Sequence, residues 1–135
     1  MSKPGSMTVI GEFLPEEVLP FVANSPKRNE LYPPDRIYLN YRVDMTSLRY
    51  HCFKKSLSCV KCGLVGTTFR LEYNNTQLER TPDRAHFNLY SAEGVLMTKD
   101  HILPKSKGGK DHIDNLRTYC SPCNHKRGNK DDNIL

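Results

Sequence analysis

Two Cys-x-x-Cys pairs, Cys59/Cys62 and Cys120/Cys123, constrain the fold of this 135-residue chain more than any other feature. Four thiolates in two such pairs are typical of a tetrahedral zinc site, which here would join segments about 60 residues apart. Two disulfides or a redox dithiol are the alternatives. The pattern predicts a structural zinc ion whose removal unfolds the domain. The fifth cysteine, Cys52, is expected as a small buried residue on a helix.

Length and charge limit the class of protein. With 135 residues the chain has room for one domain, or for a compact core with an appendage. It lacks an apolar run long enough to span a bilayer and a secretory signal, so we expect a cytoplasmic protein without membrane contact. The net charge is +5, and residues 99–130 hold eight Lys or Arg against three Asp or Glu. Such a basic cluster is typical of a surface that binds nucleic-acid phosphates.

The first third of the chain is rich in proline. Residues 11–36 hold five of the nine prolines, with charges of both signs between them. Proline there predicts an extended arm or short turns rather than a core element, and we place this arm at residues 1–43. Residues 37–43 resemble a short strand or the entry to a helix that Asp44 would cap. The remaining residues, 44–135, are expected to form the main domain.

After the first Cys pair, short strand-like runs alternate with turns. The expected strands are residues 67–73, 86–90, 95–99 and 115–119, with a hairpin turn at 91–94. A loop rich in Lys and Gly, residues 104–110, separates the last two strands. A short helix over 121–127 follows, with Pro122 at a tolerated first-turn position. The predicted order in this α+β chain is therefore strand, long loop, strand, helix.

Three polar residues lie where that order brings a strand end and a helix together. Asp100 and Asn124 offer the oxygen ligands that a hard divalent cation prefers, and His101 can take a proton from water near neutral pH. Because consecutive strand residues point to opposite faces, Asp100 and His101 share a site only if the strand bends or ends there. His112 is an alternative to His101 for the proton, and His125 to Asn124 for the metal. Each residue also has a plainer role in a turn, a helix cap or a solvated surface.

Taken together, D100-H-I-x-P104, G108-G109, N115-L116, C120-x-x-C-N124 and R127-G128 resemble the HNH endonuclease family, which has the ββα-metal or His-Me finger fold. The resemblance covers residues 98–130 and reaches back to Cys59 if the first Cys pair is included. It implies a small ββα-metal core with a structural four-cysteine zinc site, preceded here by the Pro-rich arm and a helix. A small free-standing chain of this kind resembles the nucleases of phages and mobile elements, which would act in the cytoplasm of the host cell.

The resemblance also implies roles for single residues. His101 would be the general base that activates water, and Asp100 and Asn124 would bind the catalytic cation. Asn115 would hold the loop around His101, and the four cysteines of the two pairs would bind the structural zinc. Because the last motif residue is Asn124 rather than histidine, two oxygens and no imidazole are left for the cation. This set favours Mg²⁺ or Mn²⁺ over a catalytic zinc or nickel.

The resulting hypothesis is a metal-dependent DNA endonuclease that nicks or cuts both strands, leaving 5′-phosphate and 3′-hydroxyl ends. The expected contacts to the DNA backbone come from Lys105, Lys107, Lys110, Lys126, Arg127 and Lys130. Contacts of this kind position double-stranded DNA but carry little sequence specificity. The Pro-rich arm could dock a protein partner. The alternative is a zinc-ribbon module that binds nucleic acid or assists assembly without cutting, and such a module has no need of Asp100, His101 and Asn124 together.

Overall fold

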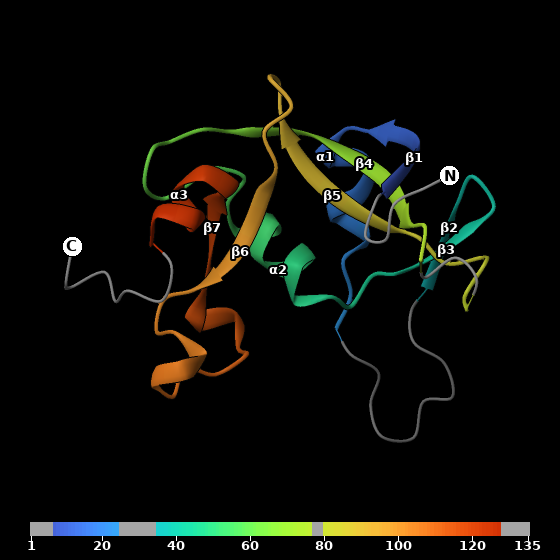
Figure 1. Cartoon of the computed structure of the whole chain (residues 1–135). Helices are drawn as coiled ribbons and strands as arrows, with labels where there is room; N and C mark the ends of the chain where they lie inside the picture. Colours follow the sequence, from blue (N-terminus) through green and yellow to red (C-terminus); the bar gives the residue numbers. More distant parts are fainter. Residues whose placement is uncertain (1–6, 25–34, 77–79, 128–135) are drawn as a thin grey trace. The chain divides into compact units, whose positions relative to one another are not determined.

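The computed structural model describes residues 7–24, 35–76 and 80–127, which form a mixed α+β protein as predicted (Figure 1). In chain order the elements are β1 (Met7–Phe13), α1 (Pro15–Val18), η1 (Leu19–Phe21), β2 (Asp35–Tyr38), β3 (Tyr41–Asp44), α2 (Leu48–Lys55), β4 (Gly66–Asn74), β5 (His86–Ser91), β6 (Met97–His101), η2 (Lys105–Lys107), η3 (Ile113–Asn115), β7 (Leu116–Cys120) and α3 (Ser121–Arg127), where η marks a 3-10 helix. No helix in these described ranges is both long and apolar enough to cross a membrane.

The chain divides into two compact units. Unit 1 comprises Met1–Thr46 and Thr68–Asn88, and unit 2 comprises Ser47–Thr67 and Leu89–Leu135. The boundary expected between residues 43 and 44 lies near the division at Thr46. Residues 68–88, which we had expected in the main domain, cluster instead with unit 1, because β4 pairs with β1. The assignment of residues 44–135 as the functional domain stays a prediction.

Unit 1 contains most of a three-stranded sheet with strand order β1-β4-β5. Its core is aromatic: the rings of Phe13, Tyr38 and Phe87 meet edge to face, with centroids 4.8–5.5 Å apart. Such edge-to-face contacts match the positive edge of one ring to the negative face of the next. The two strands β2 and β3 form a separate hairpin.

The described part of the N-terminal region is not the arm that its prolines suggested. β1 is a full member of the sheet, and Val18 of α1 is fully buried. Pro15 and Pro20 each lie at the start of a short helix, where the missing N–H has no cost. The prolines are therefore compatible with packed structure. Residues 25–34, which hold three of the five prolines, lie outside the described residues, and partner docking by residues 1–43 stays a prediction.

Residues 37–43 were expected as one strand or a helix entry, but they contain a tight turn. Leu39 and Asn40 both have positive φ, of 49° and 72°, which is the backbone that a two-residue hairpin requires. Asp44 was expected to cap the following helix. It accepts hydrogen bonds from Thr46 instead, and the cap of α2 is Ser47, whose hydroxyl accepts from the backbone N–H of Arg49.

Unit 2 is built on the antiparallel pair β6 and β7, with helices on both faces (Figure 1). Thr118 of β7 lies within 3.6 Å of the buried Cys52 sulfur on α2. On the opposite face, Thr98 of β6 accepts a hydrogen bond from Asn124 of α3. Because side chains alternate along a strand, α2 contacts side chains on one face of the β6–β7 ribbon and α3 contacts those on the other face. The predicted order of strand, long loop, strand and helix is confirmed.

The loop between β6 and β7 is compact because of its glycine pair. Gly108 has a φ of 91°, in the left-handed region that favours glycine. A Cβ atom on Gly109 would lie 1.8 Å from the carbonyl oxygen of Leu103, so no side chain fits there. The pair folds the loop back toward the end of β6, and two short 3-10 helices, η2 and η3, lie within it.

Candidate functional site

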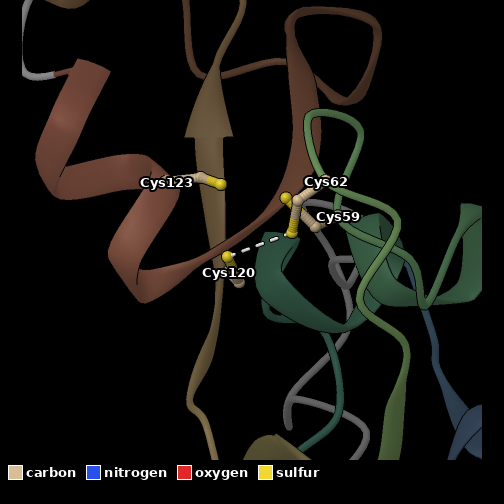
Figure 2. A group of neighbouring side chains, drawn as sticks. All are labelled: Cys59, Cys62, Cys120 and Cys123. Carbon is tan, nitrogen blue, oxygen red and sulfur yellow. Dashed lines mark hydrogen bonds between the residues drawn. The ribbon is translucent and has the colours of Figure 1, made fainter.

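The four cysteines of the two pairs converge, as Figure 2 shows. All four sulfur atoms lie within 4.8 Å of one another, and the Sγ atoms of Cys62 and Cys120 are 3.7 Å apart. A tetrahedral zinc with bonds of about 2.3 Å would place its sulfur ligands roughly 3.8 Å apart. The distances and the donor set therefore fit a metal ion. All five cysteines of the chain are free thiols in the structure.

The first pair is presented by a tight knuckle after α2. Gly63 donates its N–H to the carbonyl oxygen of Cys59, and its φ of 80° is the backbone that this turn needs. The backbone N–H of Val60 donates to the carbonyl oxygen of Thr118, which fixes the knuckle against β7. The second pair lies at the end of β7 and in α3. Both pairs are thus held by the β7 end of the ribbon.

The thiol groups of these cysteines differ in pKa because their hydrogen-bond partners differ. Burial opposes ionisation of Cys59, but backbone N–H groups of Cys120, Cys62 and Lys61 outweigh it and lower its pKa to about 6. Hydrogen bonding with Cys120 is the main cause that raises the pKa of Cys123 to about 12. A divalent cation would displace the remaining protons and hold all four sulfurs as thiolates. This cysteine cluster could therefore hold a metal ion.

Asp100 lies near the other end of β6 and is held by an arginine. Its Oδ2 accepts a hydrogen bond of 2.7 Å from Nη1 of Arg127 in the last turn of α3. The side chain of Asp100 is 13% exposed, and that of Arg127 is 3% exposed. The ion pair is thus nearly buried, and it uses one of the two carboxylate oxygens.

Asn124 is oriented by a chain of hydrogen bonds. Its Nδ2 donates to the hydroxyl of Thr98 at 3.0 Å, and that hydroxyl donates to the carbonyl oxygen of Tyr119 at 3.0 Å. Because the hydroxyl proton of Thr98 is used on Tyr119, Thr98 can only accept from Asn124. The amide nitrogen of Asn124 therefore faces Thr98, and its Oδ1 faces away. Thr98 and Asp100 lie on the same face of β6, so α3 brings Asn124 and Asp100 to the same surface.

His101 is the last residue of β6 and still pairs with Leu116, so the strand ends after His101 and not between Asp100 and His101. Its Nε2 lies 2.6 Å from Oδ1 of Asp111, and Nζ of Lys105 lies 2.7 Å from the other oxygen. These bonds, from Lys105 first and His101 second, lower the pKa of Asp111 to about 2. An ionised carboxylate can only accept, so Nε2 of His101 carries the proton of this bond. When Nε2 carries the only ring proton, the other ring nitrogen, Nδ1, is an acceptor.

Asn115 ties the two ends of the loop together. Its Oδ1 accepts from the backbone N–H of Leu103, and its Nδ2 donates to the carbonyl oxygens of Leu103 and Lys110. Its own carbonyl oxygen accepts from the N–H of Ile102, next to His101. These hydrogen bonds join both ends of the loop that follows His101. Asn115 contributes them from the end of η3.

The two alternative histidines have other positions. Nδ1 of His112 accepts from the backbone N–H of Asp114, so this side chain caps η3. Its side chain is 63% exposed. His125 is exposed on α3, one residue after Asn124. His112 therefore caps η3, whereas His101 contacts Asp111 and Asn124 contacts Thr98.

The candidate DNA contacts separate into exposed and buried cations. Lys105, Lys107, Lys110 and Lys126 are exposed, although Lys105 is paired with Asp111. Arg127 needs correction, because its guanidinium is buried against Asp100 and the carbonyl oxygen of Ile102 rather than presented at the surface. Lys130 lies outside the described residues.

Sequence reasoning missed two residues at this end of β6. Asp111 contacts His101 from ten positions along the chain, and only its place after the Gly-Gly turn could have signalled it. Thr98 orients Asn124, and its position two residues before Asp100 on the same strand face was the available signal. The polar end of the ribbon is therefore defined by five side chains, which are Thr98, Asp100, His101, Asp111 and Asn124.

Comparison with known proteins identifies one related family. Residues 91–135 match the family model of the HNH endonucleases. The matched segment begins at Ser91, the last residue of β5, and includes β6, the loop, β7 and α3, together with the second Cys pair. No curated protein and no solved structure matches the chain.

Proposed function

We propose, because residues 91–135 match the family model of the HNH endonucleases, that this protein is a metal-dependent DNA endonuclease that hydrolyses phosphodiester bonds. The proposed active core is the ββα-metal arrangement of β6, β7 and α3. The observation that supports the proposal is that α3 contacts the Thr98 and Asp100 face of β6 through Asn124 and Arg127, next to His101 at the last residue of this strand, within the matched segment. The cysteine cluster is proposed to hold a structural zinc, because four thiolates at these distances suit that ion.

His101 is the proposed general base. Its Nε2–H is bound to the ionised Asp111, so the lone pair of Nδ1 is left to accept a proton from water. A carboxylate bound to the far nitrogen also stabilises the imidazolium that forms when the proton arrives. Water that has lost its proton to His101 would attack the phosphorus in line, opposite the departing 3′ oxygen.

Asp100 and Asn124 are the proposed ligands of the catalytic cation. The hydrogen bonds described above use Oδ2 of Asp100 and Nδ2 of Asn124, which leaves one Oδ1 on each residue. Two hard oxygens without an imidazole suit Mg²⁺ or Mn²⁺. When bound, such a cation supplies charge stabilisation for the scissile phosphate and the departing oxygen.

The exposed lysines are the proposed contacts to the DNA backbone. Lys107 and Lys110 lie on the loop between β6 and β7, and Lys126 lies on α3 beside Asn124. Lysines bind phosphates through charge and carry no sequence information. We therefore propose double-stranded DNA as the substrate, with weak sequence preference.

A plasmid assay tests the proposal. Supercoiled DNA is incubated with the full chain and Mg²⁺ or Mn²⁺, beside a His101→Ala variant whose fold is checked by circular dichroism. We expect nicked or linear products with 5′-phosphate and 3′-hydroxyl ends from the wild type, and a rate about 10²- to 10⁴-fold lower from the variant. An intact plasmid under every divalent ion would contradict the enzymatic function. Equal cutting by His101→Ala would contradict only the assignment of the base.

A second candidate function has one observation in its favour. Asp100 is already neutralised by a buried arginine, so its carboxylate is satisfied without a cation. A zinc-ribbon module that binds nucleic acid without cutting would need no more. Binding of duplex DNA without any cleavage in the same assay would favour this module over the enzyme.

A further inference from the structure

Arg127 stands out because it is a buried cation that directly follows the exposed Lys126 on α3. Its side chain is 3% exposed, and it lies on the last turn of α3. One guanidinium nitrogen, Nη1, donates to Oδ2 of Asp100 at 2.7 Å. The other, Nη2, donates to the carbonyl oxygen of Ile102 at 2.9 Å. The two acceptors are the residues immediately before and after His101.

The shape of the guanidinium explains why an arginine is present. A buried charge is costly unless it is paired and hydrogen-bonded, and the pair with Asp100 meets that requirement. The planar fork of arginine reaches two acceptors at a fixed spacing, whereas the single ammonium of lysine is a point charge. The bridge therefore joins α3 to the chain on both sides of His101.

Building on the proposed nuclease function, we propose that Arg127 is a positioning residue that sets Asp100 and the chain direction at His101. By holding Oδ2 of Asp100, it leaves Oδ1 for a cation, which must share the charge of this carboxylate with the guanidinium. By holding the carbonyl oxygen of Ile102, it fixes the point at which β6 ends. The guanidinium of Arg127 thus weakens cation binding at Asp100, and it holds Asp100 and His101 in a fixed arrangement.

Two substitutions separate the charge of Arg127 from its two-point contact. Arg127→Met keeps a long side chain but removes the charge and both hydrogen bonds. Arg127→Lys keeps the charge beside Asp100 and loses the fork that spans both acceptors. Lys126→Met, at the next position on α3, is the matched control, because it removes an exposed cation that contacts neither acceptor. Asp100→Asn shows whether the measured cation binds at this site.

The experiment measures Mn²⁺ binding directly, by the loss of the free-ion electron paramagnetic resonance signal, using the zinc-loaded full chain. We expect Arg127→Met to bind Mn²⁺ at least about threefold more tightly, because the competing charge is gone. We expect Arg127→Lys to bind it as the wild type does. Plasmid nicking at saturating Mn²⁺ should fall about 10- to 100-fold in Arg127→Met and less in Arg127→Lys. Lys126→Met should weaken DNA binding and leave Mn²⁺ binding unchanged.

Several results would overturn the inference. Unchanged or weaker Mn²⁺ binding by folded Arg127→Met would show that the guanidinium does not compete for Asp100. A nicking rate that falls only in proportion to the folded fraction, measured by thermal unfolding, would reduce Arg127 to a packing role. If wild type binds Mn²⁺ through Asp100 and does not nick DNA, the nuclease function fails, while the shift in Mn²⁺ binding still tests the effect of Arg127 on Asp100.

Discussion

The two ends of the β6–β7 ribbon carry different kinds of side chains, cysteines at one end and polar residues at the other. At the end where Met97 pairs with Cys120, four sulfur atoms lie within 4.8 Å of one another and could hold one metal ion. At the end where His101 pairs with Leu116, the polar side chains are tied to a loop and a helix by separate hydrogen bonds. We call these the sulfur end and the polar end.

The difference shows how stability and chemistry can be separated in a small chain. The sulfur end joins the knuckle after α2 to β7 and α3, so a metal bound there holds the unit together. The side chains of the polar end are held by hydrogen bonds to the loop or to α3, so changing one of them should leave the scaffold at the sulfur end in place. Substitutions at the sulfur end should therefore affect folding, and those at the polar end should affect rate.

The largest expected effect comes from breaking the sulfur end. Cys59→Ser should abolish cooperative unfolding of unit 2 in thermal denaturation followed by circular dichroism, because it removes a ligand of the proposed structural zinc. Cys52→Ala is the matched control, since Cys52 is buried on α2 outside the cluster, and it should keep the bound zinc with a modest loss of stability. Thermal denaturation that a strong chelator leaves unchanged would contradict the role of this end.

A smaller effect is expected when the carboxylate behind His101 is altered. Asp111→Asn can donate to Nε2 of His101 and so favour the tautomer with its proton on Nδ1. We expect nicking to slow about 10- to 100-fold, with unchanged zinc content and melting temperature. Asp114→Asn removes a nearby carboxylate whose side chain is 88% exposed and should leave the rate unchanged. Equal rates for both variants would remove Asp111 from the polar end.

The sequence predicted the convergence of the four cysteines at the sulfur end, and the zinc ion expected there stays a prediction, whereas several contacts of the polar end were missed. Cysteine pairs and glycine turns are local signals, so the knuckles and the order of β6, loop, β7 and α3 could be predicted. The contacts of Asp111 and Arg127 depend on how a loop and a helix fold back onto β6, which no local pattern encodes. The role of β1 was missed for a related reason, because its pairing with β4 outweighs the prolines that follow it.

A third prediction concerns the orientation of Asn124. Thr98→Val removes the hydroxyl that accepts from Asn124, while Thr98→Ser keeps it. Loss of one hydrogen bond is worth about 1 kcal/mol, so we expect the valine variant to nick about fivefold more slowly and the serine variant to resemble the wild type. Single-turnover rates at saturating Mg²⁺ measure the difference. Identical rates in both variants would mean that Thr98 does not orient a ligand.

The smallest effect is expected from one exposed lysine of the loop. Lys107→Ala should lower the slope of log binding constant against log salt concentration by about one, because one phosphate contact is lost. Fluorescence anisotropy with a short duplex over a range of salt concentrations measures this slope. The cleavage rate at saturating DNA should change little. An unchanged slope would place Lys107 outside the DNA-binding surface.

The proposal that the sulfur end is structural and the polar end catalytic is tested most directly by following both metals in one experiment. The full chain is freed of weakly bound cations, and its zinc content is measured by native mass spectrometry while Mg²⁺ is titrated into a plasmid-nicking assay. We expect zinc to stay bound at the cysteines throughout, and nicking to appear only as Mg²⁺ is added. Nicking by the zinc-loaded chain without Mg²⁺ or Mn²⁺ would contradict it, because the sulfur end would then take part in the chemistry.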